Sequence, residues 1–393
     1  MWFVCLAVAA MLVAGACGSG TSRGAHLAKI GVVAPLDAGL TRYGRGIRNA
    51  VKAAVDQANA RKAVPGWRLE VDARDDSSDP PKGEASARKL AAEKDVIAVV
   101  GTYNSGVAAK VAPVLAGAGI AMLSPGNTDP ALTKGDDPAH PQRPRATYFR
   151  LVAADDVQGP FLAEAAFDDI HARKVAVVSQ TKPVSKGLAD NFSSAFTKRG
   201  GNIALTRVVP DDARDFTDVA KAIAPLHPDL VFFGGEYDAG APLATALRAA
   251  GVTVPLMGGD GIKDDSFISK AGPASDGDLA STVGAPVANI PTAKPFTDAY
   301  DAGHYADPAS DFGIYAYDAT NLIVAAAAKA LKGADQVTAR VRSDIVASVQ
   351  AANTAGASGK LAFDQYGDPV TKIFTLYRVS NGAWTPIKTG PAP

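Results

Sequence analysis

Cysteine is nearly missing from this chain: only Cys5 and Cys17 occur among 393 residues, both near the amino terminus. The chain beyond residue 17 therefore has no thiol, which excludes a disulfide framework, a cysteine metal site and a cysteine nucleophile there. An excess of charge of one sign is also missing, since 40 basic residues balance 40 acidic ones. That balance argues against a charge-driven partner such as nucleic acid or a bare membrane surface.

The motifs of common enzymes are missing as well. We find no nucleophile elbow between a strand and a helix, no H-E-x-x-H pair, no Walker A loop and no strand-linked G-x-G-x-x-G. The five histidines show no helical ligand spacing, so the sequence predicts no metal site and no cofactor. We therefore expect a protein that is not an enzyme, with an exported hydrolase of unrecognised type as a remote alternative.

The longest apolar run, Trp2–Ala16, is short for a membrane span and ends in Ala14-Gly15-Ala16-Cys17. Small residues before a cysteine, followed by a Gly/Ser tether, resemble the lipobox of a bacterial lipoprotein, whose cysteine is acylated. We expect residues 1–16 to be a signal peptide and 17–26 a flexible tether anchored to the outer face of the cell membrane through Cys17. An ordinary secretory signal with a chance cysteine is the alternative.

The most informative segment runs from Asp95 to Thr133. An apolar run, Val96–Val100, reads as a buried strand and is followed by a polar turn, with a helix predicted to start near Ser105. A second apolar run, Ile120–Leu123, ends in another polar turn, Ser124–Thr128. Because parallel strands bring their carboxyl ends to one edge, both turns should meet there. A helix start beside hydroxyl groups suits a small anion such as a carboxylate.

Strand and helix patterns alternate along most of the chain. Two runs of such units, about residues 27–145 and 147–284, predict two doubly wound parallel-sheet lobes of an α/β protein. Predicted helices at about 312–330 and 340–352 have no sheet of their own, so we expect them to pack on the first lobe. A terminal hairpin is predicted from Gly359–Phe363 and Ile373–Val379. In the second run, Asp155 or Asp156 is expected to cap a helix predicted over residues 155–171.

Seven segments in one order resemble the periplasmic-binding-protein type I family, specifically solute-binding proteins of branched-chain amino acid ABC importers. They include KIGVVAPLDAGLTRYGRGIRNAVKAAVDQAN, VIAVVGTYNSGVAAKVAPVLAGAGIAMLSPGNTDPALT, YFRLVAADDVQGPFLAE, PDLVFFGGEYDAGAPLATALRAAG, LMGGDGI and GKLAFDQYGDPVTKIFTLYRV. The resemblance implies two lobes joined by a three-segment hinge, with the ligand held in the cleft between them. The amino-terminal lobe is expected at 27–147 plus 285–358, and the carboxyl-terminal lobe at 148–284 plus 359–393.

The resemblance also implies ligand-binding residues. Ser105 and Thr128 match positions that bind a ligand carboxylate, and Asp260 matches the acidic residue that receives the ammonium. Further matching positions lie along the cleft: Tyr43, Gly126, Asn127, Glu236 and Phe312. Taken one at a time, these residues also suit turns, caps or core positions.

The resemblance implies an amino acid ligand, branched-chain or related, delivered to ABC permease subunits by a monomeric extracytoplasmic lipoprotein. Asp260 is one methylene shorter than the glutamate common in the family, Glu236 adds a carboxylate, and Val184 stands where a tyrosine is frequent. A polar or cationic ligand therefore stays open. The alternative function is a receptor lobe that senses an amino acid, amide or polyamine and signals to a membrane partner.

Overall fold

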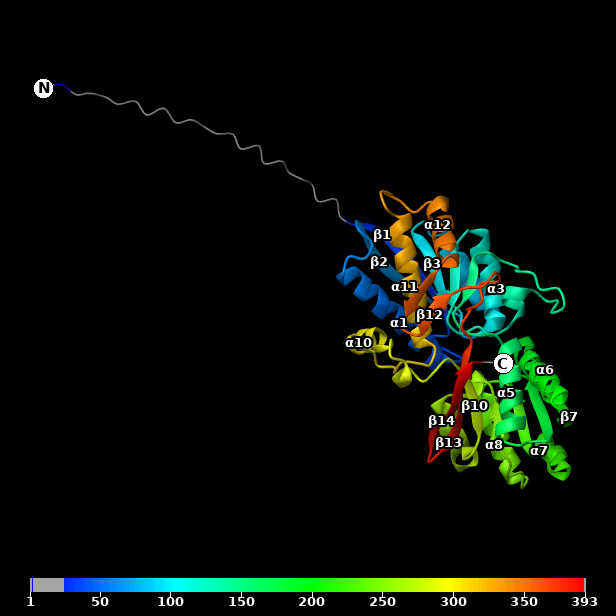
Figure 1. Cartoon of the computed structure of the whole chain (residues 1–393). Helices are drawn as coiled ribbons and strands as arrows, with labels where there is room; N and C mark the ends of the chain where they lie inside the picture. Colours follow the sequence, from blue (N-terminus) through cyan, green and yellow to red (C-terminus); the bar gives the residue numbers. More distant parts are fainter. Residues whose placement is uncertain (1, 3–24, 392–393) are drawn as a thin grey trace.

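Two α/β lobes, each built around one large sheet, make up the computed structural model, which describes residues 2 and 25–391 (Figure 1). The first sheet has five parallel strands in the order β2-β1-β3-β4-β5. Its strands are β1 (His26–Ala34), β2 (Trp67–Asp75), β3 (Val96–Gly101), β4 (Ala121–Ser124) and β5 (Tyr148–Arg150). Strand β3 is buried along its whole length, as expected for an apolar run in a parallel sheet.

The second sheet has seven strands in the order β14-β13-β10-β9-β8-β6-β7. Strands β6 to β10 run parallel, whereas β13 and β14 form an antiparallel edge. The bounds are β6 (Lys174–Gln180), β7 (Asn202–Val209), β8 (Leu230–Gly234), β9 (Leu256–Gly258), β10 (Leu279–Val283), β13 (Ile373–Ser380) and β14 (Ala383–Pro391). The predicted fold class, two doubly wound lobes, is confirmed.

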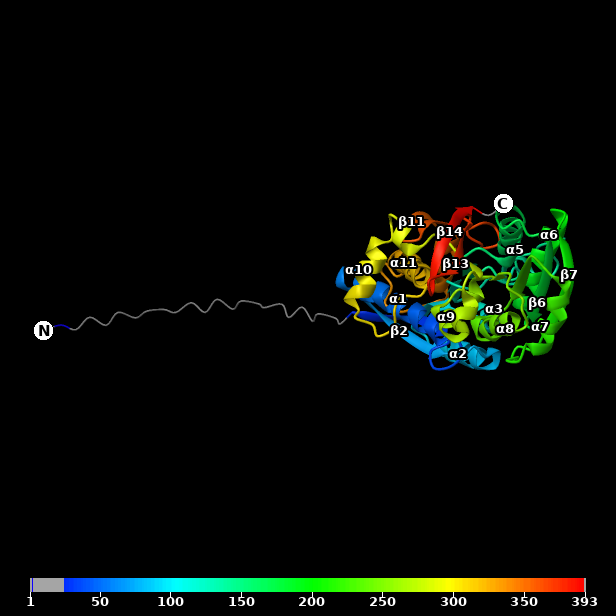
Figure 2. The ribbon, with the colours of Figure 1, turned by 90° about the horizontal axis from the view of Figure 1, so that it is seen from below.

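Helices cover both faces of each sheet (Figures 1 and 2). The first lobe carries α1 (Thr41–Ala60), α2 (Pro80–Ala92), α3 (Ser105–Gly117), α4 (Ala131–Lys134), α10 (Lys294–Ala302), α11 (Gly313–Ala330) and α12 (Ala339–Gln350). The second lobe carries α5 (Asp155–Glu164), α6 (Pro183–Lys198), α7 (Thr217–Ile223), α8 (Tyr237–Ala249) and α9 (Asp265–Ala271). Short turns are the π-helical η1 (Ala165–Asp169) and the 3-10 turns η2 (Ala224–Leu226), η3 (Asp260–Ile262), η4 (Gly272–Ser275) and η5 (Val287–Asn289).

Helix α11 belongs to the first lobe although it follows the second lobe in sequence. It packs against α1 and α12, and buried residues lie on nearly every side of the helix. On α1, Ile47, Val51 and Val55 lie on the buried face, as the 3.6-residue spacing predicts. The prediction that these late helices return to the first lobe is confirmed.

The predicted terminal hairpin is wrong. Strand β12 (Gly359–Ala362) pairs with β11 (Asn353–Gly356), and β13 pairs with β10 and β14. The segment between β12 and β13 therefore crosses from one lobe to the other and forms part of the hinge, because its two ends belong to different lobes. A second hinge segment leaves β5 after Arg150, slightly beyond the boundary expected at residue 147, and a third follows β10.

The two lobes touch each other across the cleft. Tyr43 Oη of the first lobe donates to the Lys263 carbonyl oxygen of the second at 3.1 Å. The Arg42 guanidinium lies 3.1 Å from the Asp264 carboxylate and 2.7 Å from that of Asp265. The structure is therefore a closed form of the cleft.

The predicted signal peptide (1–16) and the lipidation site Cys17 lie outside the described residues, as does most of the tether predicted at 17–26. Within residues 2 and 25–391, no helix is both long enough and apolar enough to cross a membrane.

Candidate ligand-binding site in the cleft

A cavity lies between the lobes where the carboxyl ends of several strands meet. Its wall from the first lobe is formed by Tyr103, Asn104, Ser105, Gly126 and Thr128. Its wall from the second lobe is formed by Asp155, Val184, Ser185, Leu188, Gly235, Glu236, Asp260 and Gly261. Five of the eight ligand-binding residues proposed from sequence thus line one cavity: Ser105, Gly126, Thr128, Glu236 and Asp260. The position is the one expected for ligands in open parallel sheets.

The first lobe offers hydrogen-bond donors to this cavity. Helix α3 begins at Ser105, as predicted, and its first backbone N–H groups are without partners inside the helix. Ser105 Oγ accepts from the backbone N–H groups of Thr128 and Asp129 at 3.2 and 3.3 Å. Because both acceptor positions of that oxygen are used, its own proton is left to donate into the cavity. Hydroxyls at a helix start form a neutral anion-binding surface.

The loop that carries Thr128, residues 124–129 (the ligand loop), is held from behind. Asn127 is fully buried and does not line the cavity. Its amide nitrogen Nδ2 donates to the Tyr103 carbonyl at 2.7 Å, and its Oδ1 accepts from Tyr148 Oη at 2.9 Å. A side chain at Gly126 would contact the Tyr103 ring at 3.0 Å, so glycine allows the loop to approach that ring. Asn127 therefore shapes the loop from the core side.

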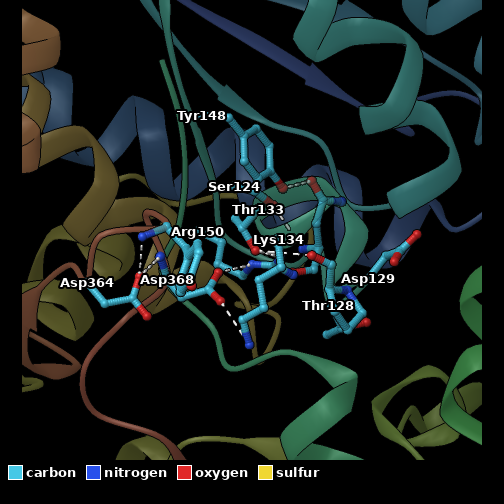
Figure 3. Close-up of polar contacts among 12 residues, drawn as sticks. Ser124, Thr128, Asp129, Thr133, Lys134, Tyr148, Arg150, Asp364 and Asp368 are labelled. Atoms are coloured by element: carbon cyan, nitrogen blue, oxygen red, sulfur yellow. Dashed lines mark hydrogen bonds and ion pairs between the residues drawn. The ribbon is translucent and has the colours of Figure 1, made fainter. Parts of the chain in front are cut away.

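A buried arginine completes this support (Figure 3). Arg150 Nη1 donates to the Asn127 carbonyl at 3.1 Å, and Nη2 donates to Thr133 Oγ1. The Arg150 guanidinium also pairs with the Asp368 carboxylate at 2.7 Å. Since Arg150 ends β5 and Asp368 lies between β12 and β13, two hinge segments and the ligand loop meet at one guanidinium.

The second lobe presents carboxylates. Asp260 follows β9 and is 8 % exposed. Burial raises the pKa of Asp260 to about 6, although a hydrogen bond with Gln158 opposes the rise. A side chain on Gly259 would lie 2.6 Å from Leu188, so glycine is needed for the close packing beside Asp260. A buried carboxylate with a raised pKa in a cavity is typical of a ligand site.

Glu236 lies at the cavity but is already paired by the protein. Its carboxylate contacts Lys182 Nζ at 2.7 Å and accepts from Asn104 Nδ2 of the opposite lobe at 2.9 Å. The sequence suggested that Glu236 could pair with a cationic ligand; in this closed form it instead links the lobes.

Tyr43 and Phe312 lie one layer behind the cavity. The rings of Tyr43 and Tyr103 stack with centroids 4.5 Å apart, and Phe312 packs edge-on against both at 5.3 and 5.0 Å. Tyr103 is the member of this group that lines the cavity. Tyr43 and Phe312 therefore act in this closed form by fixing the ring of Tyr103.

Asp155 was missed as a site residue. Helix α5 begins at Asp155 without a side-chain cap, so the expected capping role of Asp155 or Asp156 is wrong. Asp155 lines the cavity and is 1 % exposed. Burial, together with the charge of Asp260, raises the pKa of Asp155 well above its ordinary value. Its position at the start of a predicted helix was the available signal, but only the fold brings it beside Thr128.

A larger cavity of about 210 Å³ lies at the hinge and is mainly apolar. Lys360 is the one charged residue in its lining, so it offers no pair of opposite charges. The cleft cavity, with donors on one lobe and carboxylates on the other, is the better match to a zwitterion.

Comparison with known proteins places the chain in a family. A model of the periplasmic binding protein family matches residues 28–383. The chain belongs to the periplasmic binding protein family. This family binds substrates outside the cytoplasm and is not enzymatic, which confirms the expectation that the chain is not an enzyme.

Individual members of the family show what the chain is similar to. The Leu/Ile/Val-binding protein BraC3 of Rhizobium johnstonii is 28 % identical over 90 % of this chain and 92 % of its own length. The Streptococcus pneumoniae branched-chain amino acid transporter binding protein LivJ, solved with isoleucine, has a TM-score of 0.80 at 24 % identity, covering 93 % of this chain and 99 % of its own. A solute-binding protein of an ABC transporter from R. palustris, solved in complex with benzoate, has a TM-score of 0.77 at 22 % identity, covering 94 % of this chain and 98 % of its own. The last two share the fold, which accepts ligands with and without an amine.

Proposed function

We propose that the protein is the extracytoplasmic solute-binding component of an ABC importer and that it binds an α-amino acid in the cleft, which closes around it. The relatives named as Leu/Ile/Val-binding proteins support an amino acid ligand. The observation that carries the proposal is the division of polarity between the lobes. Ser105 and Thr128 offer neutral donors on one wall, and Asp260 offers a carboxylate on the other.

That division matches the two ends of a zwitterion. A carboxylate at the start of α3 gains from the free helix N–H groups and from the hydroxyls. Burial disfavours the ionised form of the Asp260 carboxylate, and an ammonium beside it stabilises that form. Because one partner belongs to each lobe, a bound amino acid would connect the lobes and favour closure over the open form. Delivery of the ligand to permease subunits and anchoring through lipid on Cys17 belong to the same proposal.

A ligand screen tests the proposal directly. We expect at least one of the twenty common amino acids to raise the melting temperature, with branched-chain amino acids first. Calorimetry should then give one site per chain, and Asp260→Ala should remove the binding while leaving the protein folded. The absence of any stabilisation across the twenty would contradict the proposed ligand class. The same screen with benzoate and polyamines tests an anion that has no amine and cations that have no carboxylate.

A further inference from the structure

The cavity of about 210 Å³ at the hinge is built from all three segments that join the lobes. Its wall takes residues 151–153 from the segment after β5, residues 283–285 from the end of β10 and the segment after it, and parts of 358–373 from β12 and the segment that follows. Among the described residues, none lines both this cavity and the cleft cavity. The hinge cavity is therefore a separate space, and an occupant would contact the connections between the lobes.

Tyr315 of α11 brings an unpaired hydroxyl to this cavity. The residue lines the cavity and is 7 % exposed, and its Oη makes no hydrogen bond with the part of the chain that the structure describes. A Cβ atom at Gly284 would lie 1.9 Å from that oxygen, and Gly284 has a φ of +76°, so the hydroxyl lies against hinge backbone that only glycine permits. A nearly buried hydroxyl without a partner is available to donate to what enters the cavity.

The neighbouring polar groups of the cavity are already satisfied. The Asp318 carboxylate, one turn after Tyr315 on α11, accepts from the backbone N–H groups of Ala357 and Ser358 at 2.7 Å each. It also accepts from Ser358 Oγ at 2.6 Å. These bonds hold the turn before β12 against α11. Although Ser358 lines the cavity, its hydroxyl proton is committed to Asp318 and is not available to an occupant.

The charge of the lining is positive. Lys360 is its one charged residue, lies exposed on β12 and forms no ion pair with the described residues. No carboxylate lines the cavity, and most of the remaining lining is aliphatic or aromatic. An apolar cavity of about 150 Å³ stays dry and holds a benzene molecule, so this cavity has room for an apolar body of about six to eight carbon atoms.

We propose that the hinge cavity is a second binding site, which takes a small monocarboxylic acid with an apolar body of about six to eight carbon atoms. The body fills the apolar space, the Tyr315 hydroxyl donates to the carboxylate, and the flexible Lys360 side chain supplies the opposite charge. Neither group requires an amine on the ligand. This site goes beyond the proposed amino acid function, because it shares no described residue with the cleft cavity.

Three probes with one apolar body separate the charge types: hexanoate, 1-hexanol and hexylamine. We would measure their affinities by NMR titration at neutral pH for the wild type, Tyr315→Phe and Lys360→Gln. Tyr317→Phe is the matched control on the same helix, because that hydroxyl donates to Gln57 Oε1 at 2.6 Å and Tyr317 does not line the cavity. Lys332→Gln, at an exposed lysine just after α11, controls for the change in net charge. Melting temperatures would show that each variant is folded.

In the wild type we expect hexanoate to bind more tightly than 1-hexanol, and hexylamine to bind least. Tyr315→Phe should weaken hexanoate binding by about tenfold, since it removes a donor to a charged group. Lys360→Gln should weaken hexanoate by about three- to fivefold and leave 1-hexanol unchanged, since an exposed charge acts only on the anion. Both control variants should match the wild type. Hydrogen exchange should slow on adding hexanoate in the hinge segments rather than in the ligand loop.

The cleft could also attract a carboxylate, so Ser105→Ala is measured with hexanoate as well. Hexanoate binding that disappears in Ser105→Ala and is unchanged in Tyr315→Phe would place the acid in the cleft and overturn the second site. A wild type that binds no hexanoate also overturns it, and equal affinity for hexanoate and hexylamine overturns the acid as the ligand class. Amino acid binding is measured separately, so failure of the proposed function leaves these outcomes distinct.

Discussion

The Arg150 guanidinium lies 2.7 Å from the Asp368 carboxylate, and Arg150 has no exposed surface. The two residues, both labelled in Figure 3, come from different hinge segments, yet the same guanidinium also donates to the carbonyl of Asn127 in the ligand loop. A buried ion pair of this kind adds little stability over an apolar replacement, but losing one partner leaves a charge without compensation. The pair therefore couples the hinge to the site.

Removing one partner of this pair should destabilise the protein strongly. We expect Asp368→Asn to lower the free energy of unfolding by about 3–5 kcal/mol, because Arg150 stays buried and charged. Urea unfolding at neutral pH measures the loss. The matched control is Asp190→Asn in the exposed Lys186–Asp190 pair, with an expected change below about 1 kcal/mol. Equal effects at the two positions would contradict the buried role of Asp368.

The hydroxyl of Ser105 should matter for ligands that carry a carboxylate. We expect Ser105→Ala to weaken leucine binding by about tenfold or more, since it removes a donor and also frees the Thr128 and Asp129 N–H groups. Leucinamide should lose less affinity, because an amide oxygen carries no charge. Calorimetry with both ligands measures the difference. An equal loss for both would place the ligand carboxylate elsewhere.

Protonation of Asp260 should make ligand stabilisation depend on pH. Its pKa in the fold is raised from 3.8 to about 6, so the folded form binds the proton more tightly than the unfolded chain. The contribution of Asp260 to ligand-free stability is therefore present below pH 3.8 and is lost as the pH rises through about 6. An ammonium ligand prefers the ionised form, so the ligand-induced rise in melting temperature should be larger at pH above 6 than below it.

The control for this pH profile is Asp260→Asn, in which both trends should diminish. Asp155 also titrates in the same cavity with a raised pKa, so some dependence should persist in that variant. A wild-type profile in which ligand stabilisation is greatest at acidic pH would contradict the ionised state of the site.

The hydrogen bond from Asn104 to Glu236 should act on ligand release. It joins the lobes at 2.9 Å, so it exists only while the cleft is closed. We expect Asn104→Ala to raise the ligand dissociation rate by about three- to tenfold with a small change in association rate. Stopped-flow fluorescence would separate the two rates. A change confined to association would show that this contact forms before closure.

Lipid attachment is tested by position 17. We expect the wild type, expressed in a bacterial host with its amino-terminal segment, to sediment with the membrane fraction, and Cys17→Ala to appear in the soluble exported fraction. Metabolic labelling with palmitate would report acylation of Cys17 directly. Equal distribution of the two proteins would favour the ordinary secretory signal.

The local sequence patterns predicted individual helices and strands better than they predicted which strands pair with each other. The helix at Ser105 and the buried face of α1 follow from spacing, since burial of one helix face depends on neighbours a few residues apart. Strand β13 was also predicted, but its hairpin with the segment at Gly359 was wrong. Strand pairing depends on residues far apart in the chain, and β13 pairs with β10 because the chain crosses between lobes there.

The sequence by itself determined the residue types available to bind each end of a zwitterion. Through the resemblance of the chain to a known family, it proposed Ser105 and Thr128 for the carboxylate and Asp260 for the ammonium without coordinates. Only the tertiary structure decided that Asp155 lines the same cavity, that Glu236 is neutralised by Lys182, and that Asn127 lies behind the loop. The physical reason is that hydrogen-bonding capacity belongs to the residue type, whereas burial and uncancelled charge depend on what the fold brings within a few ångströms.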